Sequence, residues 1–215
     1  MRGVNTIGGV TKDISNEHQA HLTQELDRIE KEFRGMMSVV DKSLIIANRL
    51  SGTGTLSMHV AKDLGAVGVV AKGSGLAIDS RKEFPYAAYP HLDFALATET
   101  GGDVSARFRV RVLEIYSTIS LIRQALVALP EGPVTAGKEA VLPPNAYAVS
   151  VAEGWRGDIV YTVATDAQGD VSRVHVRDAS FLNWPLFIQF APGNVVLDFP
   201  LMNKSCNLSY SGNDK

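Results

Sequence analysis

The sequence predicts a mainly α protein with a small antiparallel β-hairpin element near its C-terminus, an α+β class. Two long stretches within residues 14–130 place apolar residues at helical spacing. Residues 158–178 alternate apolar and polar residues on either side of a turn that contains Gly169. The chain has 215 residues, is 45% hydrophobic and carries a net charge of −2. These totals fit one globular domain with a substantial core.

The first long helix is predicted after a glycine-rich loop at residues 1–13. Asp13 or Ser15 can cap it, and it runs to about Val40. The opposite face is charged, so the helix should be half-buried. Apolar residues that recur at helical spacing are Leu22, Leu26, Ile29, Phe33, Met36 and Met37.

The segment after this helix contains a Gly-Thr-Gly sequence at residues 52–54, which resembles part of a nucleotide-binding loop. Ser57 stands where the third glycine of that motif belongs, and no clear βαβ pattern surrounds it. Ser57 instead predicts the cap of a short helix that runs through Leu64 and ends at Gly65. Residues 65–93 are predicted to be a long irregular loop, and such loops are usually functional in compact domains.

The second long helix is predicted at residues 104–129, with Asp103 as its cap and Pro130 after its end. An apolar stripe along it comprises Val112, Ile115, Ile119, Ile122 and Leu126. A second face carries Asp103, Arg107, Arg111 and Glu114. Such a row is most often a salt-bridged face in solvent, and otherwise a buried network against polar loops.

After residue 130 the sequence no longer shows the spacing of long helices. Residues 131–145 are typical of a linker, and residues 146–215 should hold the hairpin, a short helix and a C-terminal segment. The predicted organisation is thus a helical part at 14–130, a linker at 131–145 and a β-containing part at 146–215.

Composition excludes several classes of function. Near-neutral charge without a basic run gives no support for nucleic-acid binding. The single cysteine, Cys206, excludes a disulfide within the chain and a zinc site made of thiolates. The five histidines lack metal-ligand spacing, and most of them are predicted to be surface residues. No apolar run approaches the roughly 20 residues of a membrane-spanning helix, so a membrane role would depend on partners.

Several stretches, taken together, resemble one family. KGSGLAIDSRKEFPYAAY, GGDVSARFRVRVLEIYSTISLIRQAL and LPEGP are similar to the complex I 49-kDa subunit and to the large subunits of membrane-bound [NiFe] hydrogenases and formate hydrogenlyase. EGWRGDIVYTVATDAQGDVSRVHVRDASFLNW resembles that family's C-terminal hairpin, and DFPLMNKSCNLSYSGNDK its last segment. The resemblance implies a [NiFe]-hydrogenase large-subunit-like fold. It covers only the C-terminal half of such subunits, without the earlier half that carries the first metal-binding C-x-x-C.

The resemblance also predicts a lost metal site. Hydrogenases of this family end in D-P-C-x-x-C, whose thiolates hold nickel and iron. In the present chain these two cysteine positions fall on Ser209 and Gly212, and Cys206 matches neither. We therefore expect no metal and no nickel chemistry, and a small buried thiol at Cys206. Complex I, which also lacks these cysteines, uses the corresponding cavity for quinone.

Candidate site residues follow from the same resemblance. Arg156 matches the arginine that hydrogenases hold over their metals, so a catalytic role is expected; a salt bridge to Glu153 or Asp158 is the structural alternative. Asp79 and Arg81 lie in a segment resembling the complex I quinone cavity and are also catalytic candidates. Tyr86 and Tyr89, in that segment, are candidates for quinone binding. The alternative is a polar network that only fixes a long loop. Lys72 replaces the arginine usual before Gly-Ser-Gly, which keeps the charge but not the planar fork.

The resemblance implies a subunit of a membrane-associated, complex I-like (NADH-quinone oxidoreductase or hydrogenase-4-like) electron-transfer complex. The expected partners are a small [4Fe–4S] subunit, membrane-arm subunits and the missing N-terminal half. The chain itself should bind no cofactor except a quinone, NAD should act only at the level of the whole complex, and the chain should not be active alone. The expected location is cytoplasmic, peripheral to the inner or plasma membrane. The alternatives are a non-catalytic structural fragment and part of a true [NiFe] hydrogenase, against which the missing cysteines argue.

Overall fold

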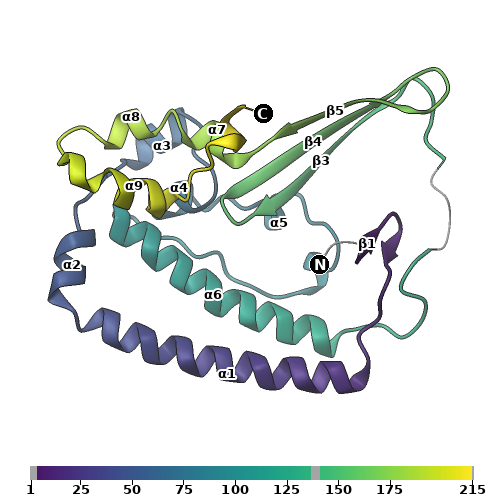
Figure 1. The fold of residues 1–215 in the computed structure, drawn as a ribbon, viewed down its shortest axis with the longest axis horizontal. Coiled ribbons are helices and arrows are strands. Elements are labelled where there is room, and N and C mark those ends of the chain that lie inside the picture. The colour runs from purple at the N-terminus through teal and green to yellow at the C-terminus, as the bar shows by residue number, and fades with distance from the viewer. Residues whose placement is uncertain (1–3, 137–140, 215) are drawn as a thin grey trace.

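The computed structural model describes residues 4–136 and 141–214 and confirms the α+β class. Two long antiparallel helices, α1 (Asn16–Asp41) and α6 (Val104–Val127), lie side by side along one edge of the molecule (Figure 1). Short helices gather above one end of this pair. A three-stranded sheet extends away from them on the other side (Figure 1).

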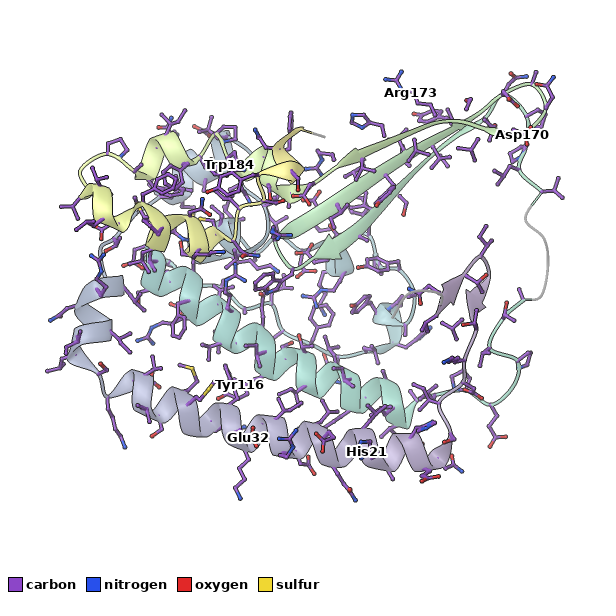
Figure 2. The ribbon with its side chains drawn as sticks, in the orientation of Figure 1. His21, Glu32, Tyr116, Asp170, Arg173 and Trp184 are labelled. Atoms are coloured by element: carbon purple, nitrogen blue, oxygen red, sulfur yellow. The ribbon has the colours of Figure 1, made fainter. Side chains whose placement is uncertain are left out.

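Helix α1 begins where its cap predicts. The Ser15 side chain accepts a hydrogen bond from the backbone N–H of His18, which settles the cap on Ser15 rather than Asp13. Only Leu26 and Met37 are buried, so the helix is half-buried as expected. It contacts α6 through the rings of Phe33 and Tyr116, which meet edge to face, and Figure 2 shows Tyr116 between the two helices.

Helix α6 is capped by Asp103, whose side chain accepts from the backbone N–H of Ala106. Its burial corrects one prediction: the row that begins at Asp103 does not form a face in solvent. Arg107 is fully buried and donates to the carbonyls of Gly54 and Gly102. The neighbouring loops present carbonyl oxygens to this face, so the second interpretation, a buried polar network, is the correct one.

The core lies where α6 meets the short helices. Helices α4 (Gly68–Gly73) and α9 (Phe199–Cys206) both pack against α6. The buried cluster includes Val69, Val70, Val110, Leu186, Phe190 and Met202. The other short elements are α2 (Leu44–Leu50), α3 (Met58–Asp63), α5 (Ser80–Glu83), η1 (Tyr89–His91), α7 (Ala179–Asn183), α8 (Phe187–Phe190), η2 (Val196–Asp198) and η3 (Ser211–Asp214).

Residues 65–93, predicted to be irregular, thus contain α4, α5 and η1. Glycine content hid these elements from the sequence reasoning, because short helices need little periodicity when neighbouring elements supply the packing. The five histidines are all exposed.

The sheet has three antiparallel strands in the order β3-β4-β5. Strands β4 (Gly157–Thr165) and β5 (Val171–Arg177) form the predicted hairpin around Gly169. Strand β3 (Tyr147–Gly154) was missed, because most of its residues are exposed and carry no clear burial pattern. Trp155 and Arg156 form the tight link between β3 and β4. Two further strands, β1 (Asn5–Thr6) and β2 (Gly9–Val10), make a small separate hairpin.

Gly68 fixes the β3–β4 link against α4, and we expect Gly68→Ala to be strongly destabilising. Its φ is +58°, and an added Cβ would lie 2.1 Å from the carbonyl oxygen of Arg156. Backbone strain and the steric clash together should lower the free energy of unfolding by roughly 2–4 kcal/mol. Urea denaturation measures this loss.

Gly65→Ala is the matched control for this substitution. Gly65 also has a positive φ, +69°, but its added Cβ would meet nothing within 4 Å. Only the backbone strain remains, so the free energy of unfolding should fall by about 1 kcal/mol. Equal losses in the two variants would contradict the proposed close contact at Gly68.

Candidate functional site

A buried cluster of charges surrounds Lys72, at the end of α4. The Lys72 side chain is 2% exposed. Its Nζ donates to Asp79 Oδ2 at 2.7 Å, to Glu114 Oε1 at 2.8 Å and to Glu153 Oε1 at 3.4 Å. The three carboxylates come from the segment before α5, from α6 and from the end of β3, so one ammonium group joins three elements with all three of its hydrogens.

Asp79 is the most strongly paired acid of this cluster. Arg81 donates to it from Nε at 2.8 Å and from Nη2 at 2.7 Å, a two-pronged contact. Burial alone would raise the pKa of Asp79, but the hydrogen bonds from Arg81 and Lys72 lower that pKa to about 2. The hydrogen bond to Asp79 raises the pKa of Arg81. Both groups are therefore charged at neutral pH.

Glu153 is held more weakly. Its Oε2 accepts from the backbone N–H of Ser80 at 3.0 Å, and Lys72 reaches its Oε1 only at 3.4 Å. Burial raises the pKa of Glu153, although Lys72 opposes this. The cluster has three acids (Asp79, Glu114, Glu153) and two cations (Lys72, Arg81), so Glu153 is the acid most ready to take up a proton.

Tyr86 and Tyr89 pack beside this cluster. The Tyr86 hydroxyl oxygen accepts from the backbone N–H of Glu153 at 3.0 Å, and the two tyrosine rings meet edge to face. The Arg81 guanidinium lies 5.6 Å from the Tyr89 ring centroid. The structure thus brings four of the five predicted site residues together around Lys72.

The cluster opens into a cleft of about 530 Å³ along α6. Lys72, Arg81, Arg111, Glu114 and Glu153 supply charged groups to its lining. Leu26, Ile29, Ile115, Ile119 and Ile122 supply apolar ones. Because the charged α6 residues precede the apolar ones, one end of the cleft is polar and the other apolar, over about 16 Å of helix.

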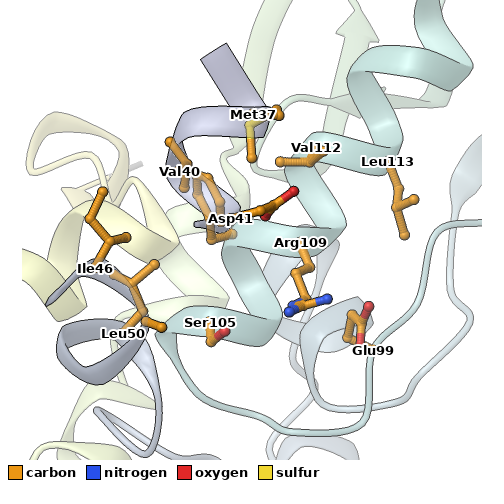
Figure 3. A pocket seen from close by; sticks show the side chains of 12 residues that line it. Met37, Val40, Asp41, Ile46, Leu50, Glu99, Ser105, Arg109, Val112 and Leu113 are labelled. Carbon is orange, nitrogen blue, oxygen red and sulfur yellow. The ribbon is translucent and has the colours of Figure 1, made fainter. Parts of the chain in front are cut away.

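Tyr89 lines this cleft. Asp79 and Tyr86 do not line it, but they form hydrogen bonds with the lining residues Lys72 and Glu153. A smaller pocket of about 210 Å³ lies between α1, α2 and α6 (Figure 3). Glu99 and Arg109 line that second pocket and not the cleft, although the backbone N–H of Glu99 donates to the carbonyl oxygen of Lys72 at 2.9 Å.

Arg156 occupies a different position from the other candidates. Its Nε donates to the carbonyl oxygen of Asn207 at 2.5 Å. Neither acid of the structural alternative pairs with it, because Glu153 binds Lys72 and Asp158 pairs with Arg177. The structure therefore places Arg156 beside the C-terminal turn, and Arg156 itself does not line the cleft. Its chain neighbours Glu153, Gly154 and Trp155 line the cleft.

In the C-terminal segment, the positions that the resemblance aligns with hydrogenase cysteines make turn contacts. Ser209 Oγ accepts from the backbone N–H of Gly212 at 3.1 Å. A Cβ at Gly212 would lie 2.7 Å from Asp178 Oδ1, so a cysteine there needs Asp178 to move. Cys206 is 1% exposed, which confirms the predicted buried thiol. Among residues 4–136 and 141–214, no group of three or more His, Cys, Asp or Glu side chains is placed to hold a metal.

Sequence reasoning missed the centre of this site. It treated Lys72 as a substitution of an arginine, Glu114 as one member of a helical row and Glu153 as a partner for Arg156. One signal was present: Lys72 directly follows Val69-Val70-Ala71, and a lysine inside so apolar a run must be paired if it is buried.

Comparisons with known proteins show the family of this chain. The profile of the family described as "Respiratory-chain NADH dehydrogenase, 49 Kd subunit" matches residues 2–150 and 138–215. The carbon monoxide-induced hydrogenase of Rhodospirillum rubrum is 35% identical over 200 residues, 93% of this chain and 55% of that protein. Formate hydrogenlyase subunit 5 of Escherichia coli strain K12 is 30% identical over 213 residues, 99% of this chain and 37% of that protein.

One solved structure is also similar: a chain of the membrane-bound sulfane sulfur reductase, an archaeal respiratory membrane complex. Its TM-score is 0.89 at 26% identity, over 97% of this chain and 58% of that chain. The fold is thus that of a subunit of a respiratory membrane complex. More particularly, the chain belongs to the family of the respiratory-chain NADH dehydrogenase 49 Kd subunit. It spans about half the length of the curated relatives, or less.

None of the helices in the described part of the chain is long and apolar enough to cross a membrane.

Proposed function

We propose that this chain forms part of the large subunit of a membrane-associated, complex I-like electron-transfer complex, of the NADH-quinone oxidoreductase or hydrogenase-4-like type. In this role its cleft serves as a quinone or proton-coupling cavity beside a [4Fe–4S] subunit. The chain would sit on the cytoplasmic side of the membrane, held there by membrane-arm subunits and completed by an N-terminal half. NAD would act only elsewhere in the whole complex.

One observation carries this proposal: the cleft has a charged end and an apolar end on the same helix face. A quinone has the same division, with polar oxygens on its ring and an apolar tail. The names of relatives support the assignment, since one of them, from Desulfotalea psychrophila strain LSv54, is a subunit of an NADH-quinone oxidoreductase and is 31% identical over 194 residues.

The residues of the cleft can supply protons as well as contacts. Reduction of a quinone places negative charge on its oxygens, and those oxygens then take up protons. Glu153 lines the cleft, and burial raises its pKa, so it can hold a proton close to the acceptor. Lys72 and Arg81 keep Asp79 ionised behind it and balance the charge that remains when the proton leaves.

Two alternatives differ in what they require. A true [NiFe] hydrogenase needs thiolates where Ser209 and Gly212 stand. A non-catalytic scaffold needs none of the ionised groups at the cleft, so substitutions of Glu153 or Arg156 would leave turnover unchanged. The variants described below separate the scaffold from the cavity.

The assembly part of the proposal is tested in the cells that make the protein. The tagged chain is extracted from membranes with mild detergent and separated on a native gel. We expect comigration with an N-terminal large-subunit portion and with a protein that shows the electron paramagnetic resonance signal of a reduced [4Fe–4S] cluster. A chain found only in the soluble fraction, without such a protein, would overturn the proposal.

Glu153→Gln tests proton coupling in the assembled complex. Quinone-analogue reduction that uses the proton of Glu153 should fall as pH rises through the raised pKa of this group. Glutamine cannot release a proton, so the variant should lose this pH dependence and about 10²-fold of the turnover. Glu99→Gln, at the second pocket, is the control and should behave as the unmodified protein. Unchanged turnover and pH profile in Glu153→Gln would exclude Glu153 as the donor.

A further inference from the structure

The polar end of the cleft adjoins a group of cations without acidic partners. Arg107, Arg111 and Arg156 surround the residues Ser205–Asn207 at the end of α9. Arg107 Nε donates to Ser205 Oγ at 2.8 Å, Arg111 Nη2 to the Ser205 carbonyl at 3.3 Å and Arg156 Nε to the Asn207 carbonyl at 2.5 Å. These acceptors are neutral, and none of the three arginines forms an ion pair with the acids of the described chain.

Among these three arginines, Arg111 lines the cleft and also has a guanidinium N–H group without a hydrogen-bond partner in the described chain. Its Nη1 atom is buried and has no hydrogen-bond partner. Glu114, one turn further along α6, is bound to Lys72 instead. Burial lowers the pKa of Arg111, and the charges of Arg156 and Arg107 lower it further, against the opposing effect of Glu114. A buried cationic donor left unpaired is costly, and a native structure that keeps one usually satisfies it with a ligand or water.

Two observations distinguish Arg111 from other unpaired donors. Arg177 Nη1 is also buried without a partner, but its Nη2 pairs with Asp158, so the charge of Arg177 is balanced. Within the part of the chain that the structure describes, Arg111 has no such ion pair, and it lines the cleft. Its guanidinium also lies 4.3 Å from the centroid of the Trp155 ring, which lines the same cleft and fixes the plane of the guanidinium.

We infer that Arg111 is the anion contact of the cleft and binds an ionised oxygen of a ring-shaped, apolar-tailed ligand through its guanidinium group. The ring lies at Trp155, and the tail runs toward Ile119 and Ile122 on the same helix. Arg156 stands behind as a second positive charge that strengthens the attraction. The assignment of the ligand as quinone-like rests on the proposed function; the anion contact rests on the contacts of Arg111.

Direct binding tests this assignment on the full 215-residue chain without any turnover. The probes are two 1,4-naphthoquinones with the same 3-alkyl tail: a 2-hydroxy compound, ionised at pH 7, and a neutral 2-methyl compound. Trp155 and Trp184 are the two tryptophans of the sequence, so quenching in a Trp184→Phe background reports on Trp155. Equilibrium dialysis on the chain with both tryptophans gives the same affinities without that substitution.

We expect the ionised probe to bind roughly tenfold or more tightly than the neutral one, as a charge-assisted hydrogen bond implies. Arg111→Gln should abolish this preference and leave the affinity of the neutral probe unchanged. Arg111→Lys should keep part of the preference, since it keeps the charge and loses the fork. Arg109→Gln removes an equal charge two residues earlier, at the second pocket, and should change neither affinity.

Different failures have different meanings. If both probes bind equally to the unmodified chain, or if Arg109→Gln matches Arg111→Gln, the anion contact at Arg111 is wrong while the quinone-type cleft survives. If neither probe binds, the anion contact and the quinone cavity fail together.

Discussion

Lys72→Met should destabilise the protein by about 3–5 kcal/mol, the usual cost of removing one partner from a buried ion pair. Methionine fills a similar volume, so the loss reflects charge rather than packing. Asp79 retains Arg81, but Glu114 and Glu153 lose the one ammonium that each contacts. Urea denaturation at pH 7 measures the difference in the free energy of unfolding.

Two further variants show whether the charge is the cause. Lys72→Arg keeps the positive charge that relatives are expected to carry at this position. The free energy of unfolding should therefore fall much less than in Lys72→Met. Adding Glu153→Gln to Lys72→Met removes one stranded acid and should restore part of the stability. A Lys72→Met protein as stable as the unmodified chain would show that the three carboxylates find other partners or water.

Arg156→Ala should reduce the turnover of the assembled complex by about tenfold, because it removes a positive charge that lies behind the cleft and offsets a developing negative charge from a distance. Arg156 has no acidic partner among the described residues, and its Nε contact to Asn207 leaves the rest of the guanidinium available. Arg156→Lys should be mild, because complex I relatives are expected to carry lysine in this segment. Turnover with a quinone analogue is the measurement.

Arg173→Ala is the matched control for this prediction. Arg173 is an exposed arginine of β5, and Figure 2 shows it on the part of the sheet that extends away from the helices. Its loss should leave turnover unchanged. Complex assembly on a native gel should also be unchanged in Arg156→Ala, so that lost turnover cannot be assigned to a missing partner. Full turnover in Arg156→Ala would favour the scaffold over the cavity.

Arg111 and Arg156 should differ in their effects although they stand close together. Arg111 lines the cleft and is expected to govern how tightly an ionised ligand binds. Arg156 contacts the C-terminal turn and acts on the cleft through its charge. Comparing binding of the naphthoquinone probes with turnover in the two variants separates direct contact from long-range stabilisation.

Local chemistry in the sequence determined most of the fold. Asp103 could be identified as a cap, and the cap of α1 could be limited to Asp13 or Ser15, because a short polar side chain before an apolar periodic stretch satisfies the first backbone N–H groups of a helix. Gly169 marked the β4–β5 turn between two alternating stretches. The ordered motifs also indicated the family, and with it a neighbourhood around Asp79, Arg81, Tyr86 and Tyr89.

Only the tertiary structure decided which polar groups are buried and paired. Helical spacing placed Arg107, Arg111 and Glu114 on one face, but it could not show that loops and α9 would cover that face. It likewise could not join Lys72 to Glu114, 42 positions away, and to Glu153, 81 positions away. A charge is stable in the interior only where its partners converge from several elements, and that convergence depends on packing rather than on spacing along the chain.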